Sequence, residues 1–405
     1  MTGFPTLKTA VLLLLILGLY LKAQPLLLMA ALLALTALAA GFWGRHALDR
    51  VSCRRSLDRA RCFAGEAVTL TVELTNRKPL PVPVLTVDEL VPEDLAVKGV
   101  RLSASGSPGK GIMRLQLALA WYQRVVRRYT LTAAQRGYYQ IGPASLSASD
   151  PFGWARSGME VPEQLSLLVY PKVLPLERFG LPSRRPFGDL RSRDPLFEDP
   201  LAAAGVRPYH PGDPLNRIHW KSTASTGRLQ VRKLDPSAQP GMAVLLNTWA
   251  FAHHWEGPDP HALELGCSLA ASIGAWAAGQ RLPVGLYANA LVAGWGFSLH
   301  LPPAGGQEAV QRMLEGLARL TMPSRQSPAE LLAAASAKLA YGTSLVYITP
   351  RVDEQLAGLL WKEARSGRPV TLILVGQPDE LPQAIPGVRT YLVPEEEAVQ
   401  HAILA

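Results

Sequence analysis

Residues 205–234, GVRPYHPGDPLNRIHWKSTASTGRLQVRKL, separate two parts of the chain that have different hydrophobic patterns. Before this stretch apolar and polar residues alternate, as in half-buried strands, and after it apolar strands alternate with helical patterns. The stretch itself is rich in aromatic and charged residues, and Asp213 is its one acid. The residues of this stretch that are candidates for a functional site are Arg207, Tyr209, Gly212, Asp213, Arg217, His219, Trp220 and Lys221.

The local pattern of this stretch predicts a turn, a short helix and a strand. Pro211 and Gly212 form a turn signal, because proline fixes φ and glycine accepts a positive φ. Asp213 followed by a proline is typical of a helix start, with the acid as N-cap. Gly227 is expected to end the helix, and residues 228–234 alternate as a strand would.

Two apolar runs near the N-terminus, residues 10–20 and 26–43, predict a two-helix transmembrane hairpin. Six arginines follow within residues 45–61, and such positive flanks favour the cytoplasmic side. We therefore expect a two-pass protein of the inner (plasma) membrane, with cytoplasmic soluble domains and the lipid bilayer as a partner. A signal peptide is the alternative, but Leu21 occupies the position where cleavage needs a small residue.

The region that follows the apolar runs has the two-residue period of strands. Ala67–Asn76 alternates cleanly, and with several similar short segments it predicts an all-β, immunoglobulin-like sandwich over residues 45–160. Residues 81–88 are expected at a sheet edge, because proline cannot donate to a ladder. The acids of this region are expected in a solvated loop: Asp88, Glu89, Glu93 and Asp94.

The rest of the chain divides into a linker and an α/β domain. Residues 161–240 are expected to hold a linker and the signature motif of residues 205–234. Residues 176–204, rich in Pro, Arg and Asp, are expected to be a long mobile loop or a segment that orders on a partner. Met242–Leu246 is an unbroken apolar strand, and strands alternate with helices from there on. This pattern predicts a doubly wound α/β domain over residues 241–405. No glycine-rich phosphate loop follows any of its strands, which disfavours a nucleotide site.

The combination of these features resembles the domain-of-unknown-function 58 family, bacterial proteins often encoded beside MoxR-type AAA+ ATPases. The residues that carry the resemblance are Arg207, Tyr209, Pro211, Gly212, Asp213, Asn216, Arg217, Ile218, His219, Trp220, Lys221, Gly227 and Leu229. Residues 136–138, 141–143 and 150–153 also look like the family's β region. The resemblance implies a von Willebrand factor A-like C-terminal domain and a MoxR-type ATPase as a partner.

Domains of the von Willebrand factor A type often bind a divalent cation through an Asp-x-Ser-x-Ser loop after the first strand. Here Asn247 replaces the leading carboxylate, Thr248 follows, and the serine pair is missing. A neutral amide is a poor substitute for the charged oxygen ligands that Mg²⁺ prefers. We therefore expect neither a metal nor another cofactor in this chain.

The candidate site can be interpreted in three ways. In a structural role, Asp213 caps the helix and accepts from an arginine, while Trp220 packs over Arg217. In a docking role, the arginines and aromatic residues meet a protein partner, since these residue types are enriched at interface hot spots. In a hydrolase, His219 would be the base and Asp213 its orienter, but six residues of separation do not place them on one helix face.

The resulting hypothesis is a membrane-anchored, non-enzymatic scaffold or adaptor that binds protein partners. The family resemblance implies work with a MoxR-type ATPase in protein assembly or maturation, together with other membrane or envelope proteins. Nucleic acid is not expected as a partner, because the basic cluster belongs to no recognised nucleic-acid-binding fold. The alternatives are a divalent-cation-dependent adhesion-type binding domain and a hydrolase that uses His219.

Overall fold

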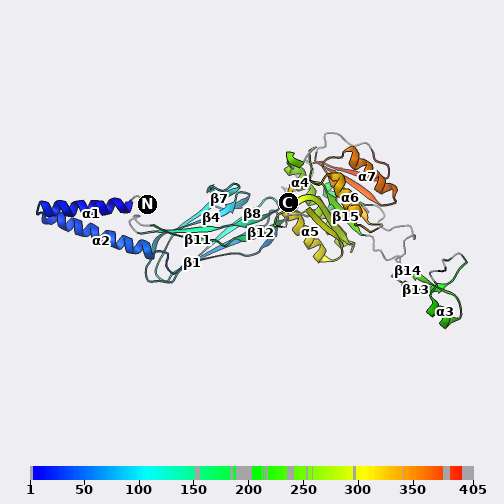
Figure 1. Cartoon of the computed structure of the whole chain (residues 1–405), viewed down its shortest axis with the longest axis horizontal. Coiled ribbons are helices and arrows are strands. Elements are labelled where there is room, and N and C mark those ends of the chain that lie inside the picture. Colours follow the sequence, from blue (N-terminus) through cyan, green and yellow to red (C-terminus); the bar gives the residue numbers. More distant parts are fainter. Residues whose placement is uncertain are drawn as a thin grey trace. The chain divides into compact units, whose positions relative to one another are not determined.

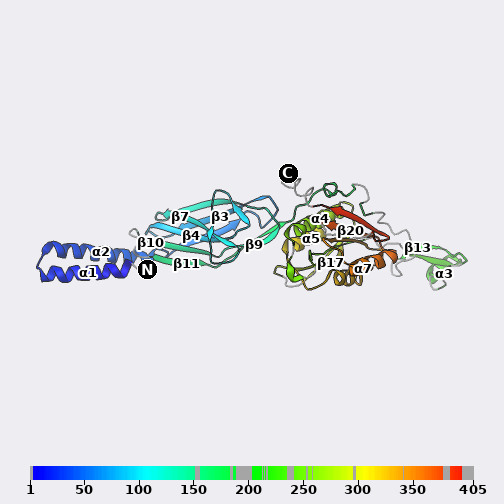
Figure 2. The same ribbon diagram turned by 90° about the horizontal axis from the view of Figure 1, so that it is seen from above.

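A computed structural model describes most of the chain. The described residues are 3–150, 156–182, 186–187, 203–211, 213, 215, 218–234, 241–251, 254–257, 259–294, 298–340, 342–376 and 384–394. They form two compact units, Met1–Tyr170 and Pro171–Ala405. Figures 1 and 2 show their elements, coloured from the N-terminus to the C-terminus.

The first unit begins with two apolar helices, α1 (Gly3–Tyr20) and α2 (Gln24–His46). They lie side by side in both views (Figures 1 and 2), and a Cβ on Gly18 of α1 would come within 2.9 Å of Leu27 of α2. Helix α2 is long and apolar enough to cross a membrane, and little of it is buried. These helices are consistent with a membrane anchor.

The rest of the first unit is rich in β-structure, which confirms the β-rich class predicted for it. Its sheets have the strand orders β1-β3-β8-β5, β11-β10-β4-β7-β6 and β2-β12-β9. The strands are β1 (Val51–Leu57), β2 (Arg61–Phe63), β3 (Ala67–Asn76), β4 (Val82–Pro92), β5 (Leu95–Val97), β6 (Ser103–Ala104), β7 (Lys110–Leu119), β8 (Arg124–Ala133), β9 (Gly137–Ile141), β10 (Ala144–Ser149), β11 (Arg156–Val161) and β12 (Leu165–Tyr170). Alternate side chains of β3 and β4 fill one shared core.

The predicted edge position of residues 81–88 is wrong. These residues belong to β4, which lies between β10 and β7 inside its sheet. The proline is tolerated because pairing with β10 extends only to Val84, and the register with β7 shifts between Val82 and Leu85. Pro83 therefore lies at an irregular strand end, where a missing N–H breaks no ladder bond.

Two of the acids expected in a solvated loop lie instead in strand β4. Asp88 forms an exposed ion pair with Arg114 of β7, with 2.7 Å between the carboxylate and the guanidinium. Glu89 is buried and pairs with Arg55 of β1, which also donates to the backbone carbonyl of Glu163. This pair joins strands of two sheets across the core. Burial raises the pKa of Glu89, and the nearby Arg55 opposes that shift.

The second unit is built on one mixed sheet, which confirms the α/β class predicted for it. The strand order is β17-β16-β15-β19-β20-β21, and β18 also pairs with β16; the pairings are parallel except those of β17 and β18 with β16, which are antiparallel. The strands are β15 (Met242–Leu246), β16 (Val284–Val292), β17 (Ser298–Ala304), β18 (Leu320–Pro323), β19 (Ser344–Thr349), β20 (Val370–Val375) and β21 (Val388–Val393). Strand β17 was not predicted, because it contains two prolines, and proline is found in sheets mainly in edge strands such as this one.

Helices cover both faces of this sheet. They are α4 (Pro260–Gly279), α5 (Gln307–Arg319), α6 (Pro328–Ser336) and α7 (Glu354–Arg365). Alternate residues of β15 enter different cores: Val244 packs with residues of α4 and α5, whereas Leu245 packs with residues of α6 and α7. This division explains why Met242–Leu246 is apolar at every position.

The segment expected to be a loop, residues 176–204, contributes to the α/β core. Leu176–Phe179 forms a 3-10 turn, and Leu176, Phe179, Leu181 and Phe187 are buried in the cluster that contains α4. Strand β13 (Ala203–Pro208) begins at the other end of the segment. The loop prediction was therefore wrong at both ends of the segment. The segment is mostly polar, and its composition does not reveal the few apolar residues that are buried.

Candidate functional site

The signature element, residues 203–234, consists of two strands and one short helix. Strand β13 pairs antiparallel with β14 (Gln230–Leu234), and α3 (Trp220–Thr226) lies between them in the chain. Ile218 forms a β-bridge with Val231, and both side chains are buried. This small apolar contact holds the segment before α3 against β14.

The predicted start of the short helix is wrong. The helix begins at Trp220, whereas we expected Asp213 to cap it. Asp213 instead accepts two hydrogen bonds from the guanidinium of Arg207, at 2.7 and 2.6 Å, and one from the backbone N–H of His210 at 2.8 Å. These bonds, that of Arg207 first, lower the pKa of Asp213 to about 2. The expected pairing of Asp213 with an arginine is thus confirmed, and the pair closes the turn after β13.

Helix α3 is capped by His219. Its Nδ1 accepts from the backbone N–H of Ser222 at 3.1 Å, so this nitrogen carries no proton and the ring N–H is on Nε2. Gly227 ends the helix in the left-handed conformation at φ 65°, as predicted from the sequence. The polar groups of His219 and Asp213 are therefore engaged in separate local contacts.

The outward side of the signature element is apolar and basic. Trp220 is 68% exposed and Leu215 is 69% exposed, and Lys221 and Arg228 are exposed as well. Tyr209 is partly buried and its backbone N–H donates to the carbonyl of Leu229. Gly212 and Arg217 lie outside the described residues, and with Arg217 so does its predicted contact with Trp220.

A second candidate region lies at the carboxyl ends of β15 and β19. The strand order of the sheet reverses between these two strands, and ligands of doubly wound sheets usually bind at such a point. Asn247 follows β15 directly and Thr349 ends β19, and the amide of Asn247 donates to the hydroxyl of Thr349 at 2.9 Å. Asn289 of β16 donates to Asn247 Oδ1 at 2.7 Å.

This network of side chains is buried and bonded within itself. Asn247 Oδ1 also accepts from the backbone N–H of Trp249, and the Thr248 N–H donates to Asn289 Oδ1 at 2.8 Å. Asn247, Thr248, Asn289 and Thr349 are each at most 4% exposed. Within the described part of the chain, His, Cys, Asp and Glu residues form no group of three that could hold a metal ion.

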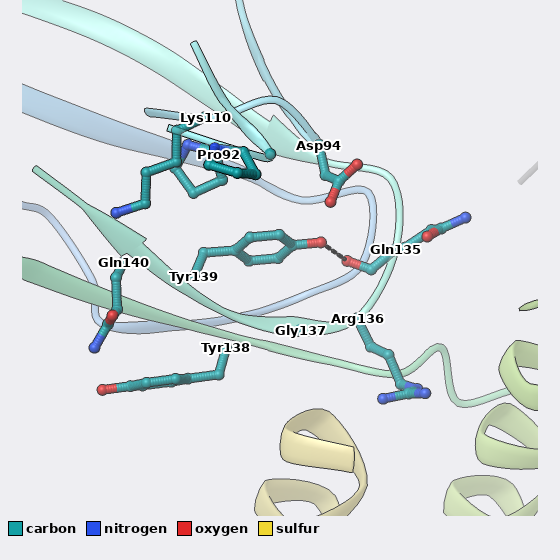
Figure 3. A pocket seen from close by; sticks show the side chains of 11 residues that line it. Pro92, Asp94, Lys110, Gln135, Arg136, Gly137, Tyr138, Tyr139 and Gln140 are labelled. Carbon is teal, nitrogen blue, oxygen red and sulfur yellow. Dashed lines mark hydrogen bonds between the residues drawn. The ribbon is translucent and has the colours of Figure 1, made fainter. Parts of the chain in front are cut away.

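The β-rich region carries an open pocket of about 370 Å³ beside strand β9. Figure 3 shows the Tyr139 ring crossing it, with Lys110 and Asp94 on one side and Tyr138 on the other. The Tyr139 hydroxyl donates to the backbone carbonyl of Gln135 at 3.1 Å. The pocket combines charges of both signs and shares no residue with the signature element.

Sequence reasoning missed the buried pair of Arg55 and Glu89, because nothing local in the sequence signals a contact between strands so far apart. Cys53 lies two residues before Arg55, and burial raises the pKa of its thiol to about 11. Such a thiol is protonated at neutral pH and therefore a poor nucleophile. The pair is a buried contact between strands of two sheets.

Comparison with known proteins finds a family model that matches part of the chain. Residues 205–351 match the family model described as "Protein of unknown function DUF58". The "Uncharacterized protein YeaD" of Bacillus subtilis (strain 168) is 23% identical over 217 residues, which are 53% of this chain and 52% of that protein. The chain thus matches about half the length of this curated relative.

Solved structures resemble parts of the chain only loosely. The CARDB domain of a Pyrococcus furiosus protein is 12% identical, covers 29% of this chain and 89% of its own, and has a TM-score of 0.19. A non-cellulosomal cohesin from Archaeoglobus fulgidus is 9% identical, covers 30% of this chain and 91% of its own, and has a TM-score of 0.21. TM-scores this low do not establish a shared fold.

Proposed function

We propose that this chain, which matches the DUF58 family model over residues 205–351, is a membrane-anchored, non-enzymatic scaffold that docks protein partners through the signature element. In this proposal α1 and α2 cross the inner membrane as a hairpin and the soluble regions lie in the cytoplasm. The β-rich region is an immunoglobulin-like spacer, and the α/β region is a von Willebrand factor A-like binding domain. The partner is a MoxR-type AAA+ ATPase.

The observation that carries the proposal is the exposure of Trp220 on the first turn of α3. A tryptophan that is 68% exposed leaves a large apolar surface in water, and Leu215 and Leu229 of the same element are also exposed. Exposed apolar side chains that occur in a group mark interaction sites more often than scattered ones do. Tryptophan and arginine are also the residue types that dominate interface hot spots.

The charge of the signature element favours an acidic partner surface. Its one acid, Asp213, is neutralised locally by Arg207, whereas Lys221 and Arg228 are exposed. Exposed basic side chains attract an acidic protein surface and help to set the orientation of binding. The charge of the element therefore favours a partner with an acidic surface, and the family resemblance suggests which protein that partner is.

A non-enzymatic role is supported by how the polar groups of the element are used. A hydrolase would need His219 to accept a proton from Ser222 or Ser225 while Asp213 held the other ring nitrogen. Here His219 Nδ1 receives a backbone N–H, and Asp213 is held by Arg207 and by the backbone of His210. Both groups act as local structural contacts.

The proposed topology is supported by the length and flanks of α2. The helix has 23 residues, or about 34 Å at about 1.5 Å per residue, which exceeds a hydrocarbon core of about 30 Å. Arg45 stands in its last turn, and further arginines follow it in sequence. A positive flank of this kind favours a cytoplasmic position for all that follows.

A binding assay with the intact protein tests the proposal. The full chain is placed in lipid nanodiscs, immobilised, and exposed to the MoxR-type ATPase encoded nearest to it, with ATP analogue and with ADP. Wild-type protein is expected to bind, and Trp220→Ala is expected to lose most of that binding. The matched control is Trp255→Ala, because Trp255 is similarly exposed at 69% but lies outside the signature element. If wild-type protein does not bind with either nucleotide, the proposed partner is wrong.

A further inference from the structure

The loop between β7 and β8 presents two exposed aromatic side chains near the end of α2. Trp121 is 68% exposed and Tyr122 is 69% exposed. The tyrosine has a φ of 50°, a conformation uncommon for a bulky residue. Neither side chain contributes to the core of the β-rich region, so packing within the unit does not explain them.

Hydrogen bonds through Lys78 connect this loop to the residue that follows α2. The Tyr122 N–H donates to the carbonyl of Lys78 at 3.3 Å. The ammonium of Lys78 donates in turn to the carbonyl of Ala47, which follows the last residue of α2, and to that of Asp49 at 2.8 Å. Lys78 is itself 5% exposed, so it acts as a buried clamp between the helix end and the loop.

The loop is also fixed to the end of β3. Asn76 donates from its backbone to the carbonyl of Gln123 at 2.9 Å, and its side chain donates to the carbonyl of Ala120 at 2.9 Å. Bonds on both sides of the aromatic pair restrict its motion. A preorganised loop loses little conformational entropy when its side chains bind.

The same end of the unit carries exposed positive charge. Arg45 lies in the last turn of α2, and Arg50 and Arg77 are exposed beside the clamp, joined by a backbone hydrogen bond of 3.0 Å. Asp49 is exposed but is paired with His46 at 2.6 Å. Aromatic side chains combined with arginines are typical of the zone where lipid headgroups meet the hydrocarbon core.

We propose that Trp121 and Tyr122 bind the headgroup region of the bilayer in which α2 is anchored, with Arg50 and Arg77 facing anionic headgroups. The inference rests on the proposed membrane anchoring of α2. If α2 fills the hydrocarbon core, its last turn lies at headgroup depth, and the clamp holds the loop near that depth. The aromatic pair then forms a second contact with the membrane and fixes the tilt of the β-rich region on it.

The experiment uses the full chain with 5-fluorotryptophan in nanodiscs that contain phosphatidylcholine and phosphatidylglycerol. A small share of the lipid carries a gadolinium chelate on its headgroup, and the ¹⁹F resonance of Trp121 is assigned with Trp121→Phe. The resonance is expected to vanish with gadolinium lipid and to persist with the diamagnetic lutetium lipid. Trp121→Phe serves only to assign the resonance and is a mild change at an exposed position. The gadolinium effect itself is measured on the wild-type chain.

Three outcomes contradict the inference, and they separate it from the proposed function. If the protein stays in the disc while gadolinium leaves the Trp121 resonance intact, only this inference fails. If the resonance is insensitive to gadolinium but shifts when the MoxR-type ATPase is added, the loop binds protein and not lipid. If the chain does not remain with the disc, the membrane anchor fails and this inference fails with it.

Discussion

Replacing Trp220 with alanine should weaken binding of the MoxR-type ATPase by about 2.5–4 kcal/mol. A tryptophan side chain buries about 150–250 Å² when fully covered. Since Trp220 is 68% exposed in the free protein, about 100–170 Å² of that area remains for a partner to cover. At about 25 cal/mol per Å² this area corresponds to the stated range, or on the order of 100-fold to 1,000-fold in Kd.

The same substitution should leave the stability of the protein almost unchanged. Trp220 contributes little to any core, and substitutions at such surface positions usually change the free energy of unfolding by no more than about 0.5 kcal/mol. Its N-capping neighbour His219 keeps its bond to Ser222, which does not involve the indole. A loss of binding without a loss of stability is therefore the expected signature of a docking residue.

The assay is a titration of the ATPase onto nanodisc-embedded protein by biolayer interferometry, with urea unfolding of the same samples followed by circular dichroism. Trp255→Ala is measured in parallel and should bind as the wild type does. Lys221→Glu should slow association and alter its dependence on salt, since exposed charges act mainly on encounter rates. The reasoning is refuted if Trp220→Ala binds within threefold of wild type.

Three further predictions concern the folded state. Asn247→Asp should lower the free energy of unfolding by about 1–3 kcal/mol in urea, because a buried donor is lost, and Mg²⁺ should not restore it; rescue by Mg²⁺ would instead support the cation-binding alternative. Glu89→Leu should cost about 3–5 kcal/mol by leaving Arg55 buried without its partner, and adding Arg55→Met should recover part of that loss in the same urea assay; a double variant less stable than the single one contradicts this account. The Asp213 carboxyl should titrate near pH 2 by ¹³C NMR and closer to its ordinary value of 3.8 in Arg207→Ala. Because its pKa is lower in the folded state, its contribution to stability is complete above pH 3.8 and is lost as the pH falls through about 2; a wild-type midpoint near 3.8 refutes the pairing.

The elements that were predictable from the sequence are those whose pattern is set by burial alone. Met242–Leu246 is apolar at every position because the sheet is covered on both faces, and the structure reproduces its bounds without a shift. Ala67–Asn76 alternates because only one side of β3 enters the core, and its bounds also agree. In both strands the burial of each position decides whether its residue is apolar. The spacing of apolar residues is therefore sufficient to predict the strand.

The wrong predictions arose where a contact between distant residues overrides a local signal. Asp213 followed by proline has the local chemistry of a helix start, but Arg207 from the neighbouring strand binds its carboxylate. Glu89 looks like a solvated acid until Arg55 is placed across the core. Phe187 lies in a polar segment but is buried near α4. None of these partners could be found by period or propensity, because each depends on the arrangement of elements.

We propose docking at the signature element because the two candidate regions use their polar groups differently. At the point where the strand order reverses, Asn247 and Asn289 bond to each other and to their own backbone, and they are buried. A partner that bound there would have to break bonds already made, whereas Trp220 and Lys221 are exposed on their own element. Substitutions in the network should therefore change unfolding, and substitutions on the element should change binding. If Asn247→Asp weakened partner binding in a chain of unchanged stability, the docking site would have to be moved to the reversal point.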